Sequence, residues 1–523
     1  MVQVGQQLMK KRAPSTVRLR IAAVVMSAAL VASCVPSTSY VGVSGRLHVW
    51  MDDIAGTLTA TWSPPPDATS TSSYELSYWR TAQSQLKESV ITAETTVVLD
   101  DIGGPLTDGT WYSFAVRAVD GDVKGRWTAE THSLYVEPDL PAIRINTTEA
   151  APILDKVNYV TGTYALDGQG ADPPASGSVE VRGRGNTTWD MPKRPYRLKL
   201  GAAASLLGMP SNRHWVLLAN HFDPSELRNS AAFALSEGTD LAWTPRSRYV
   251  ELILNGSYEG IYQLTEHIRR DTTRVNVQNV ASQTTQPGIT GGYIFEMDFW
   301  AHQQGDPGFH INSGIGFKLD DPEPPPADAP PLLLANYAQQ RAYIQNYVQT
   351  FDNVLYSPTF ADPVTGYAAY IDVDSFIDWY LVNEIAHNDD AMGTSTWFYK
   401  PRSEKVKMGP VWDFDRSMGV DGTGAYDEYW VRTRIWIHRL FEDPAFVDRV
   451  KVRWSRFEAA FRQVPASIVA AGQEPDFAMA AFTDGLRWGQ PYDLANLTSL
   501  ADWMTNRLNW LDEVTQYGDG IAP

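Results

Sequence analysis

Two clusters of carboxylates follow one another in the second half of the chain. Asn388-Asp389-Asp390 ends an apolar pattern with helical spacing, and two β-rich runs deliver Asp413 and Asp415, so both clusters are expected at the ends of regular elements. Phosphoryl transfer needs one carboxylate that orients the attacking hydroxyl and another that holds Mg²⁺ at the phosphates. Carboxylate oxygens are ligands that Mg²⁺ prefers. The two clusters therefore match the chemistry of a phosphotransferase.

The alternative is that these carboxylates are ordinary surface groups. Asp389 and Asp390 would then cap or turn a loop, and Asp413 and Asp415 would be solvated residues at strand ends. The apolar neighbours of the second cluster, such as Trp412, argue against this because they indicate a buried segment. Carboxylates inside buried segments are seldom left without a charge or a metal as partner.

A turn with two arginines precedes these clusters. The run 182–186, Arg-Gly-Arg-Gly-Asn, follows an alternating segment that predicts a strand. Backbone amides in such a turn, with arginines beside them, can cradle a phosphate; a tight hairpin with solvated arginines is the other interpretation. The next strand places Arg197 and Lys199 on one face, where one of them could reach the phosphates. Together with Lys193, they could instead form a basic surface strip.

The chain resembles the CotH-type atypical kinases, a family related to spore coat protein H. The matches occur in family order across residues 138–515. They are 181–189, 192–200, 217–220, 227–229, 250–256, 260–266, 291–296 and the segments around Asn388 and Trp412. The resemblance implies an ATP-dependent kinase with a diverged protein-kinase-like α/β fold, and ATP and Mg²⁺ as cofactors.

The resemblance also implies roles for individual residues. Asp390 matches the family's proposed catalytic aspartate, Asp413 matches its Mg²⁺ ligand, and Asp415 is a candidate for a second metal contact. Protein kinases pair a phosphate-binding lysine with a carboxylate, which predicts an ion pair between Lys199 and Glu266. The residues expected around the nucleotide are Arg182, Gly183, Arg184, Gly185, Asn186, Lys199 and Glu296.

The first 34 residues have the layout of a bacterial lipoprotein signal. Basic residues precede an apolar stretch, 21–32, that is too short to span a bilayer, and the stretch leads into Val-Ala-Ser-Cys. This resembles a lipobox, so we expect removal of residues 1–33 and lipidation of Cys34, the only cysteine of the chain. The prediction is a protein tethered at the bacterial cell surface or the extracytoplasmic side of the membrane. Ordinary cleavage near Ser33 is the alternative.

The net charge argues against nucleic acid as a partner. Removing residues 1–33 deletes five positive and no negative charges, and takes the formal net charge from −18 to −23. An acidic chain without a basic, aromatic-rich patch is a poor binder of a polyanion.

Residues 45–137 show short strands separated by turn signals, a pattern typical of an all-β Ig-like sandwich. This region resembles a fibronectin type III domain, in which Trp62 would be the core tryptophan. The inward row of its strand at 111–118 would be Tyr112, Phe114, Val116 and Ala118. The fold is nearly silent on function, and we expect a spacer or docking module.

Residues 138–515 are expected to form one large α/β (α+β) kinase-like domain, which makes the chain multidomain. A proline-rich loop should precede a helix at 335–351, and the last eighty residues should be helical, with one face carrying Leu500, Trp503, Met504, Leu508 and Leu511.

The sequence thus predicts a lipid-anchored extracytoplasmic kinase that transfers the γ-phosphate of ATP to an unknown protein or glycan hydroxyl. Two alternatives stay open. One is an adhesion or scaffold protein that uses the CotH fold as a non-catalytic binding platform, and the other is an enzyme that transfers a nucleotidyl group.

Overall fold

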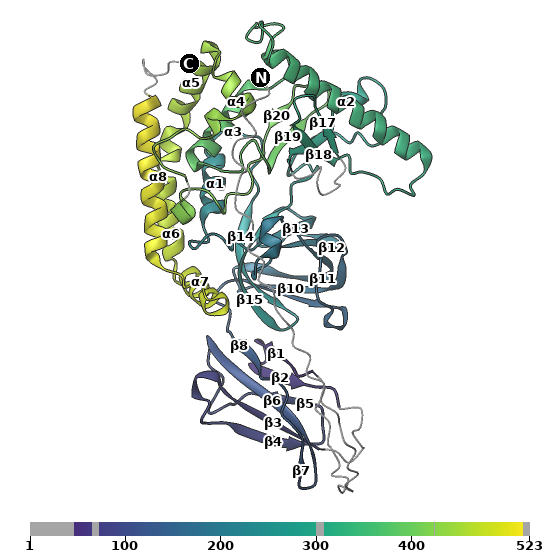
Figure 1. Cartoon of the computed structure of the whole chain (residues 1–523), viewed down its shortest axis with the longest axis vertical. Coiled ribbons are helices and arrows are strands. Elements are labelled where there is room, and N and C mark those ends of the chain that lie inside the picture. The colour runs from purple at the N-terminus through teal and green to yellow at the C-terminus, as the bar shows by residue number, and fades with distance from the viewer. Residues whose placement is uncertain (1–45, 65–72, 300–307, 423, 516–523) are drawn as a thin grey trace, which may run out of the picture.

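The computed structural model describes residues 46–64, 73–299, 308–422 and 424–515. From one end to the other, these residues form a β-sandwich, a closed β-barrel and a body of helices around a further sheet (Figure 1). The predicted signal, residues 1–33, and Cys34 lie outside the described residues. Within the described part, no helix has both the length and the apolar character needed to cross a membrane. The predicted multidomain fold, a sandwich before a larger α+β domain, is confirmed.

The sandwich has two sheets. One contains β1 (His48–Asp52), β2 (Thr57–Thr61) and β5 (Thr96–Leu99), and the other contains β3 (Ser73–Arg80), β4 (Glu88–Thr92), β6 (Thr110–Asp120), β7 (Val123–Lys124) and β8 (Thr131–Tyr135). Alternation along β6 buries Tyr112, Phe114, Val116 and Ala118, as predicted, beside Trp62. The Tyr112 hydroxyl accepts a hydrogen bond from the Thr107 amide at 2.9 Å, which makes the tyrosine corner of such sandwiches.

A closed barrel follows the sandwich. Its strands, in spatial order, are β10 (Val160–Gly168), β11 (Asp172–Gly183), β12 (Tyr196–Ala204), β13 (Asn212–Leu218), β15 (Ser257–Glu266), β14 (Ser247–Leu254) and β9 (Ala142–Thr147). Alternate residues such as Val181, Leu198 and Trp215 fill the barrel core. The residues between them, among which are Arg197 and His214, therefore lie on its outer face.

The remaining body surrounds a sheet of order β17 (Gly308–His310), β18 (Gly316–Asp321), β16 (Tyr293–Met297), β19 (Thr396–Lys400) and β20 (Lys407–Met408). Its helices are α1 (Arg228–Glu237), α2 (Pro331–Leu355), α3 (Val373–Ala386), α4 (Ile435–Leu440), α5 (Pro444–Phe461), α6 (Val464–Gln473), α7 (Pro475–Trp488) and α8 (Leu494–Thr515). The predicted helix at 335–351 is the middle of α2. On α8, Leu500, Met504, Leu508 and Leu511 are buried and Trp503 packs partly buried against the same core, which confirms the predicted face.

One sequence-based expectation about these elements is wrong. The run that carries Asp413 and Asp415 is not part of a strand, because regular pairing ends with β20 and residues 409–419 form an irregular segment. Asp413 has a φ of 70°, in the left-handed region that a strand cannot contain.

The sandwich and the barrel share a packed joint. The Met51 amide on β1 donates to the Gly256 carbonyl, in the turn between β14 and β15, at 2.8 Å. Side chains from that hairpin, Ile253 and Tyr258, belong to the hydrophobic core of the sandwich. Gly256 has a φ of 72°, and a Cβ there would come within 2.4 Å of the Trp50 Cβ. The close approach therefore depends on glycine.

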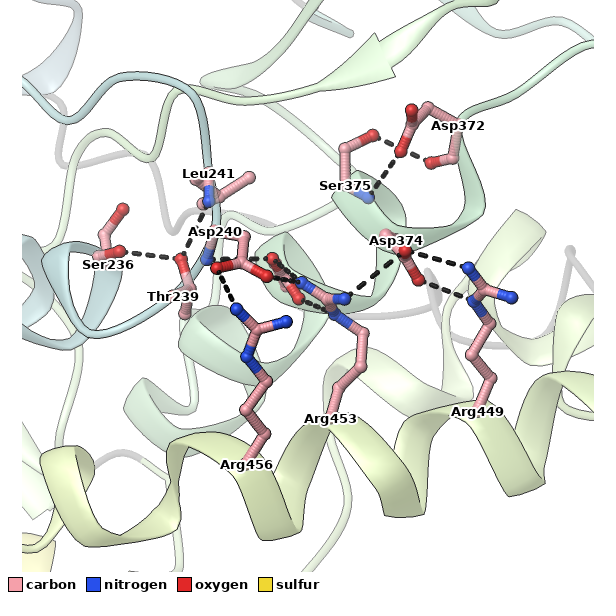
Figure 2. A network of polar contacts seen from close by, with 11 residues as sticks. Ser236, Thr239, Asp240, Leu241, Asp372, Asp374, Ser375, Arg449, Arg453 and Arg456 are labelled. Carbon is pink, nitrogen blue, oxygen red and sulfur yellow. Dashed lines mark hydrogen bonds and ion pairs between the residues drawn. The ribbon is translucent and has the colours of Figure 1, made fainter.

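Helix α3 is tied to α5 by a network of charges. Asp372 caps the start of α3 by accepting from the Ser375 amide at 3.0 Å. Arg453 on α5 forms ion pairs with Asp378 and Asp374 of α3, and also with Asp240 in the loop after α1 (Figure 2). A buried guanidinium with several carboxylate partners fixes orientation. The network thereby sets the direction in which α3 points.

Candidate active site

Asp390 follows the end of α3. The helix stops at His387, whose backbone is left-handed with a φ of 46°. Beyond it, the Asn388 side chain accepts from the Asp390 amide at 3.1 Å and donates to the Asn383 side chain at 3.0 Å. The His387 ring stacks on Trp430, with ring centroids 5.0 Å apart. His387 therefore has a packing role here, and Asn388 fixes the backbone of Asp390.

The segment of Asp413 and Asp415 is held by α1. The Phe414 amide, between the two aspartates, donates to the Asn229 side chain at 2.9 Å. The Arg228 guanidinium donates to the Ser417 carbonyl at 2.9 Å. The first turn of α1 thus supports an irregular loop that has no strand partner of its own.

The three aspartates form one acidic centre. Burial, followed by the charge of Asp413, raises the pKa of Asp390 to about 6. The same two causes, in the same order, raise the pKa of Asp415 well above its usual value. The Asp413 carboxylate accepts a hydrogen bond from the Ser395 hydroxyl at 2.8 Å. Among the described residues, no ion pair involves any of these aspartates. The structure therefore brings the predicted catalytic and metal residues together.

Arg184 faces this centre from the barrel. Its guanidinium lies over the Trp412 ring, 5.4 Å from the ring centroid. Burial lowers the pKa of Arg184, and the charges of Asp413 and Glu296 oppose that shift. Arg184 therefore supplies a partly buried positive charge beside the carboxylates.

The other groups of the arginine turn, residues 182–186, are engaged in backbone contacts or shape the turn. The amides of Gly183 and Arg184 donate to the carbonyls of Asp155 and Pro195, so they are not free to cradle a phosphate. The Arg182 guanidinium donates to a backbone carbonyl, that of Lys156. Of the predicted cradle, the part that reaches the acidic centre is the Arg184 side chain. The other members, Gly185 with a φ of 81° and Asn186, shape the turn.

Glu296 lies beside the acidic centre. It is on β16, directly opposite Lys318 on β18. Burial raises its pKa to about 8; the Lys318 charge lowers it, and the charges of Asp298 and Asp413 raise it further. A carboxyl with such a pKa is largely protonated at neutral pH, so Glu296 can donate a hydrogen bond to an anion.

The predicted ion pair between Lys199 and Glu266 is wrong. Lys199 pairs at 2.6 Å with Glu180, its direct cross-strand neighbour, and remains about a third exposed. Glu266 is fully buried and binds Arg246 at 2.9 Å, with Arg274 at 3.5 Å. The two partners of the expected pair therefore satisfy their charges elsewhere, since each has a nearer opposite charge.

Two carboxylates at the centre, Asp413 and Asp415, are the residues that could hold a metal. Across the described ranges, no three His, Cys, Asp or Glu side chains converge to hold a metal. Magnesium usually takes one or two protein carboxylates and completes its shell with water and substrate phosphates. Asp413 is partly buried and Asp415 is buried, and neither has a cationic ion-pair partner among the described residues, so the two fit that requirement.

Several residues of the site had no assigned role in the sequence. Arg228 and Asn229 belong to a matched family segment, but nothing in that segment points to a contact with the loop of Asp413. Ser395 stands in a run of small residues, which gives no indication of a functional role.

Lys193, a candidate for the basic strip, is buried and pairs with Glu226 and Asp484 at 2.8 Å each.

Comparison with known proteins agrees with this architecture. The family model described as CotH kinase protein matches residues 181–511. The chain belongs to the CotH kinase family. This supports a kinase-like function in general terms. The fibronectin type III model matches residues 45–133 of the same CotH protein. None of the curated proteins compared with the chain matches it.

Solved structures similar to the CotH protein include fibronectin domains. The third fibronectin III domain of the human KIAA0343 protein is 18% identical, with a TM-score of 0.17, and the match covers 21% of this chain and 94% of that one. A two-domain segment of chicken tenascin is 15% identical, with a TM-score of 0.15, and the match covers 33% and 97% of the two chains.

Proposed function

We propose that this CotH protein is an ATP- and Mg²⁺-dependent kinase that transfers the γ-phosphate to a hydroxyl of a protein or glycan acceptor. The observation that carries the proposal is the meeting of Asp390, Asp413 and Arg184, which come from three distant segments. A positive charge beside carboxylates is the arrangement that phosphoryl transfer uses. A pure binding platform has no need of it.

In this mechanism Asp390 orients the acceptor hydroxyl and takes its proton. The hydroxyl oxygen bonds to the γ-phosphorus as the bond from that phosphorus to the β–γ bridging oxygen breaks, and ADP leaves. Arg184 stabilises the negative charge of the phosphates. Asp413 and Asp415 would hold Mg²⁺, which neutralises the phosphates when it is bound.

The test is incubation of residues 35–523 with ATP labelled at either the γ or the α phosphorus, Mg²⁺ and candidate acceptors. Asp390→Asn and Asp413→Asn are the inactive controls, and Asp512→Asn, at the far C-terminal helix, is a matched carboxylate replacement outside the site. Acceptor label from the γ position that both inactive controls abolish supports the proposal. Label from the α position would identify a nucleotidyl transferase instead. Tight acceptor binding without any label would favour a scaffold.

We also propose that the protein is a lipoprotein anchored through Cys34 outside the cytoplasmic membrane. The support is the signal-like layout of the first 34 residues and the use of a single cysteine at the lipobox position. Metabolic labelling with a fatty-acid analogue should mark the wild type and leave Cys34→Ser unlabelled. A Cys34→Ser protein that stays in the membrane fraction would refute the anchor.

A further inference from the structure

A group of basic side chains lies on the outer face of the barrel beside the acidic centre. Lys199 on β12 is directly opposite His214 on β13, so the two side chains share a face. Arg197, two residues earlier on β12, shares that face as well. His267 follows the end of β15, and its ring centroid is 6.4 Å from that of His214. Three neighbouring strands of the barrel, β12, β13 and β15, thus bring these groups together.

Most members of this group have a buried nitrogen without a hydrogen-bond partner among the described residues. Lys199 is the exception, because it pairs with Glu180. Buried nitrogens of Arg197, His214, His267 and Arg269 have no hydrogen-bond partner in the described part of the chain. Buried polar groups are rarely left in that state, and a bound ion or water is one of the partners that can satisfy them.

The same four residues act on one another electrostatically. Burial, and then the charges of Arg269 and Arg197, lower the pKa of His214 to about 3. Burial and the charge of Arg197 likewise lower the pKa of His267. Both imidazoles are therefore neutral at pH 7, and the positive charge of the cluster comes from the two arginines. Glu323 is the carboxylate that acts most strongly on Arg269.

The backbone beneath the two histidines is held in place. The Arg274 guanidinium donates to the carbonyl oxygens of both His214 and His267, at 2.8 Å each. The buried Glu266 carboxylate, 3.5 Å from Arg274, balances the charge of this arginine. One buried arginine thus fixes the spacing of the imidazoles, and the cluster is organised before any ligand arrives.

We propose that Arg197, His214, His267 and Arg269 form an anion subsite that binds a phosphate group. Two guanidiniums and two imidazole N–H donors can reach several oxygens of a tetrahedral anion at once, whereas a planar carboxylate offers only two oxygens. Arg184 lies within electrostatic reach of both Arg197 and Asp413, so the subsite neighbours the acidic centre. Its ligand rests on the proposed kinase function: the phosphate belongs either to the nucleotide or to a phosphorylated acceptor.

The experiment is titration calorimetry of residues 35–523 with inorganic tripolyphosphate in EDTA. It uses an Asp413→Asn background, which removes transfer but leaves the basic cluster intact. We expect binding that Arg197→Gln and Arg269→Gln each weaken about tenfold, because each removes a charge-assisted hydrogen bond. Lys199→Gln is the matched control, since it removes a paired charge from the same strand and face, and should change the affinity less than twofold.

The outcomes separate this inference from the kinase proposal. Absent binding, or equal affinity in all variants, would overturn the subsite even if phosphoryl transfer is observed. A loss of tripolyphosphate affinity that is confined to Arg197→Gln and Arg269→Gln would support the subsite even if no acceptor is ever labelled. Thermal unfolding checks that each variant folds. If Arg197→Gln does not fold, the affinity of Arg269→Gln, whose substitution lies beyond β15, decides whether the subsite exists.

A second titration distinguishes the two sources of the phosphate. Inorganic phosphate is added to protein that is already saturated with ADP. Competition between them would assign the subsite to the phosphates of the nucleotide. Independent phosphate binding, still sensitive to Arg269→Gln, would assign it to a phosphorylated acceptor.

Discussion

The side-chain oxygen of Asn229 accepts the backbone N–H of Phe414 at 2.9 Å, across 185 positions of sequence. This bond holds the peptide unit between Asp413 and Phe414, the residue that precedes Asp415. The Asn229 amide nitrogen in turn donates to Asn220 at 3.0 Å. The geometry of the segment that carries Asp413 and Asp415 thus depends on a residue that carries no charge.

Replacing Asn229 with Ala should weaken both folding and the site. It leaves the Phe414 N–H and the Asn220 oxygen buried without partners, at a cost of about 1–3 kcal/mol each. Urea denaturation should show that loss, and titration with Mg²⁺ and ATP should show weaker binding. Asn509→Ala, on the exposed side of α8, is the matched control. Unchanged nucleotide affinity in Asn229→Ala would mean that the bond does not position Asp413.

Activity should fall on acidification through the pKa of Asp390. Burial and the Asp413 charge raise that pKa to about 6. A protonated carboxyl cannot take the proton of an acceptor hydroxyl, so kcat/KM, which reports on the free enzyme, should drop below about pH 6. A profile recorded from pH 5 to 8 checks this. A rate that stays flat across that range would remove Asp390 from the role of base.

Lys199 and Glu266 should respond very differently to substitution. Lys199→Ala removes a partly exposed pair with Glu180 and should cost less than about 1 kcal/mol of stability, with turnover nearly unchanged. Glu266→Gln removes a fully buried charge that faces two arginines, and should cost about 3–5 kcal/mol. Denaturant unfolding and phosphotransfer assays measure both. Loss of turnover in a stable Lys199→Ala protein would restore the kinase-type pair.

Stability should depend on pH through Glu251, a buried residue of β14. It accepts from the Leu140 amide at 2.8 Å and from the Tyr258 hydroxyl at 2.7 Å. Burial raises its pKa from 4.5 to about 7, so the folded state binds the proton more tightly than the unfolded state. The resulting stability is complete below pH 4.5 and is lost as the pH rises through 7.

The wild type should therefore lose about 3 kcal/mol more than Glu251→Gln between pH 4.5 and pH 8. Urea unfolding at several pH values gives this difference directly, and the comparison cancels other groups with raised pKa values. Parallel curves for the two proteins would show that Glu251 titrates normally.

The periodic elements are predictable because their burial repeats with a fixed period. The inward row of β6 and the buried face of α8 follow from local spacing alone. Closure of the barrel does not, since it depends on parallel pairing of β14 with β9, over a hundred residues earlier. No local pattern encodes such a pairing.

The acidic residues of the site are predictable because carboxylates in apolar surroundings are unusual. Their supports are not, because Asn229 and Ser395 act through contacts that only the folded chain creates. The error at Lys199 has a similar cause. The alternation along β12 correctly places Lys199 on the same face as Arg197. Lys199 nevertheless pairs with Glu180, the residue directly across the sheet.

The joint at Gly256 and Trp50 has a mechanical consequence. The sandwich core includes side chains of the barrel hairpin. We therefore expect the two modules to move as one rigid body, without a flexible hinge between them. A molecule that binds the fibronectin module would then also set the orientation of the acidic centre.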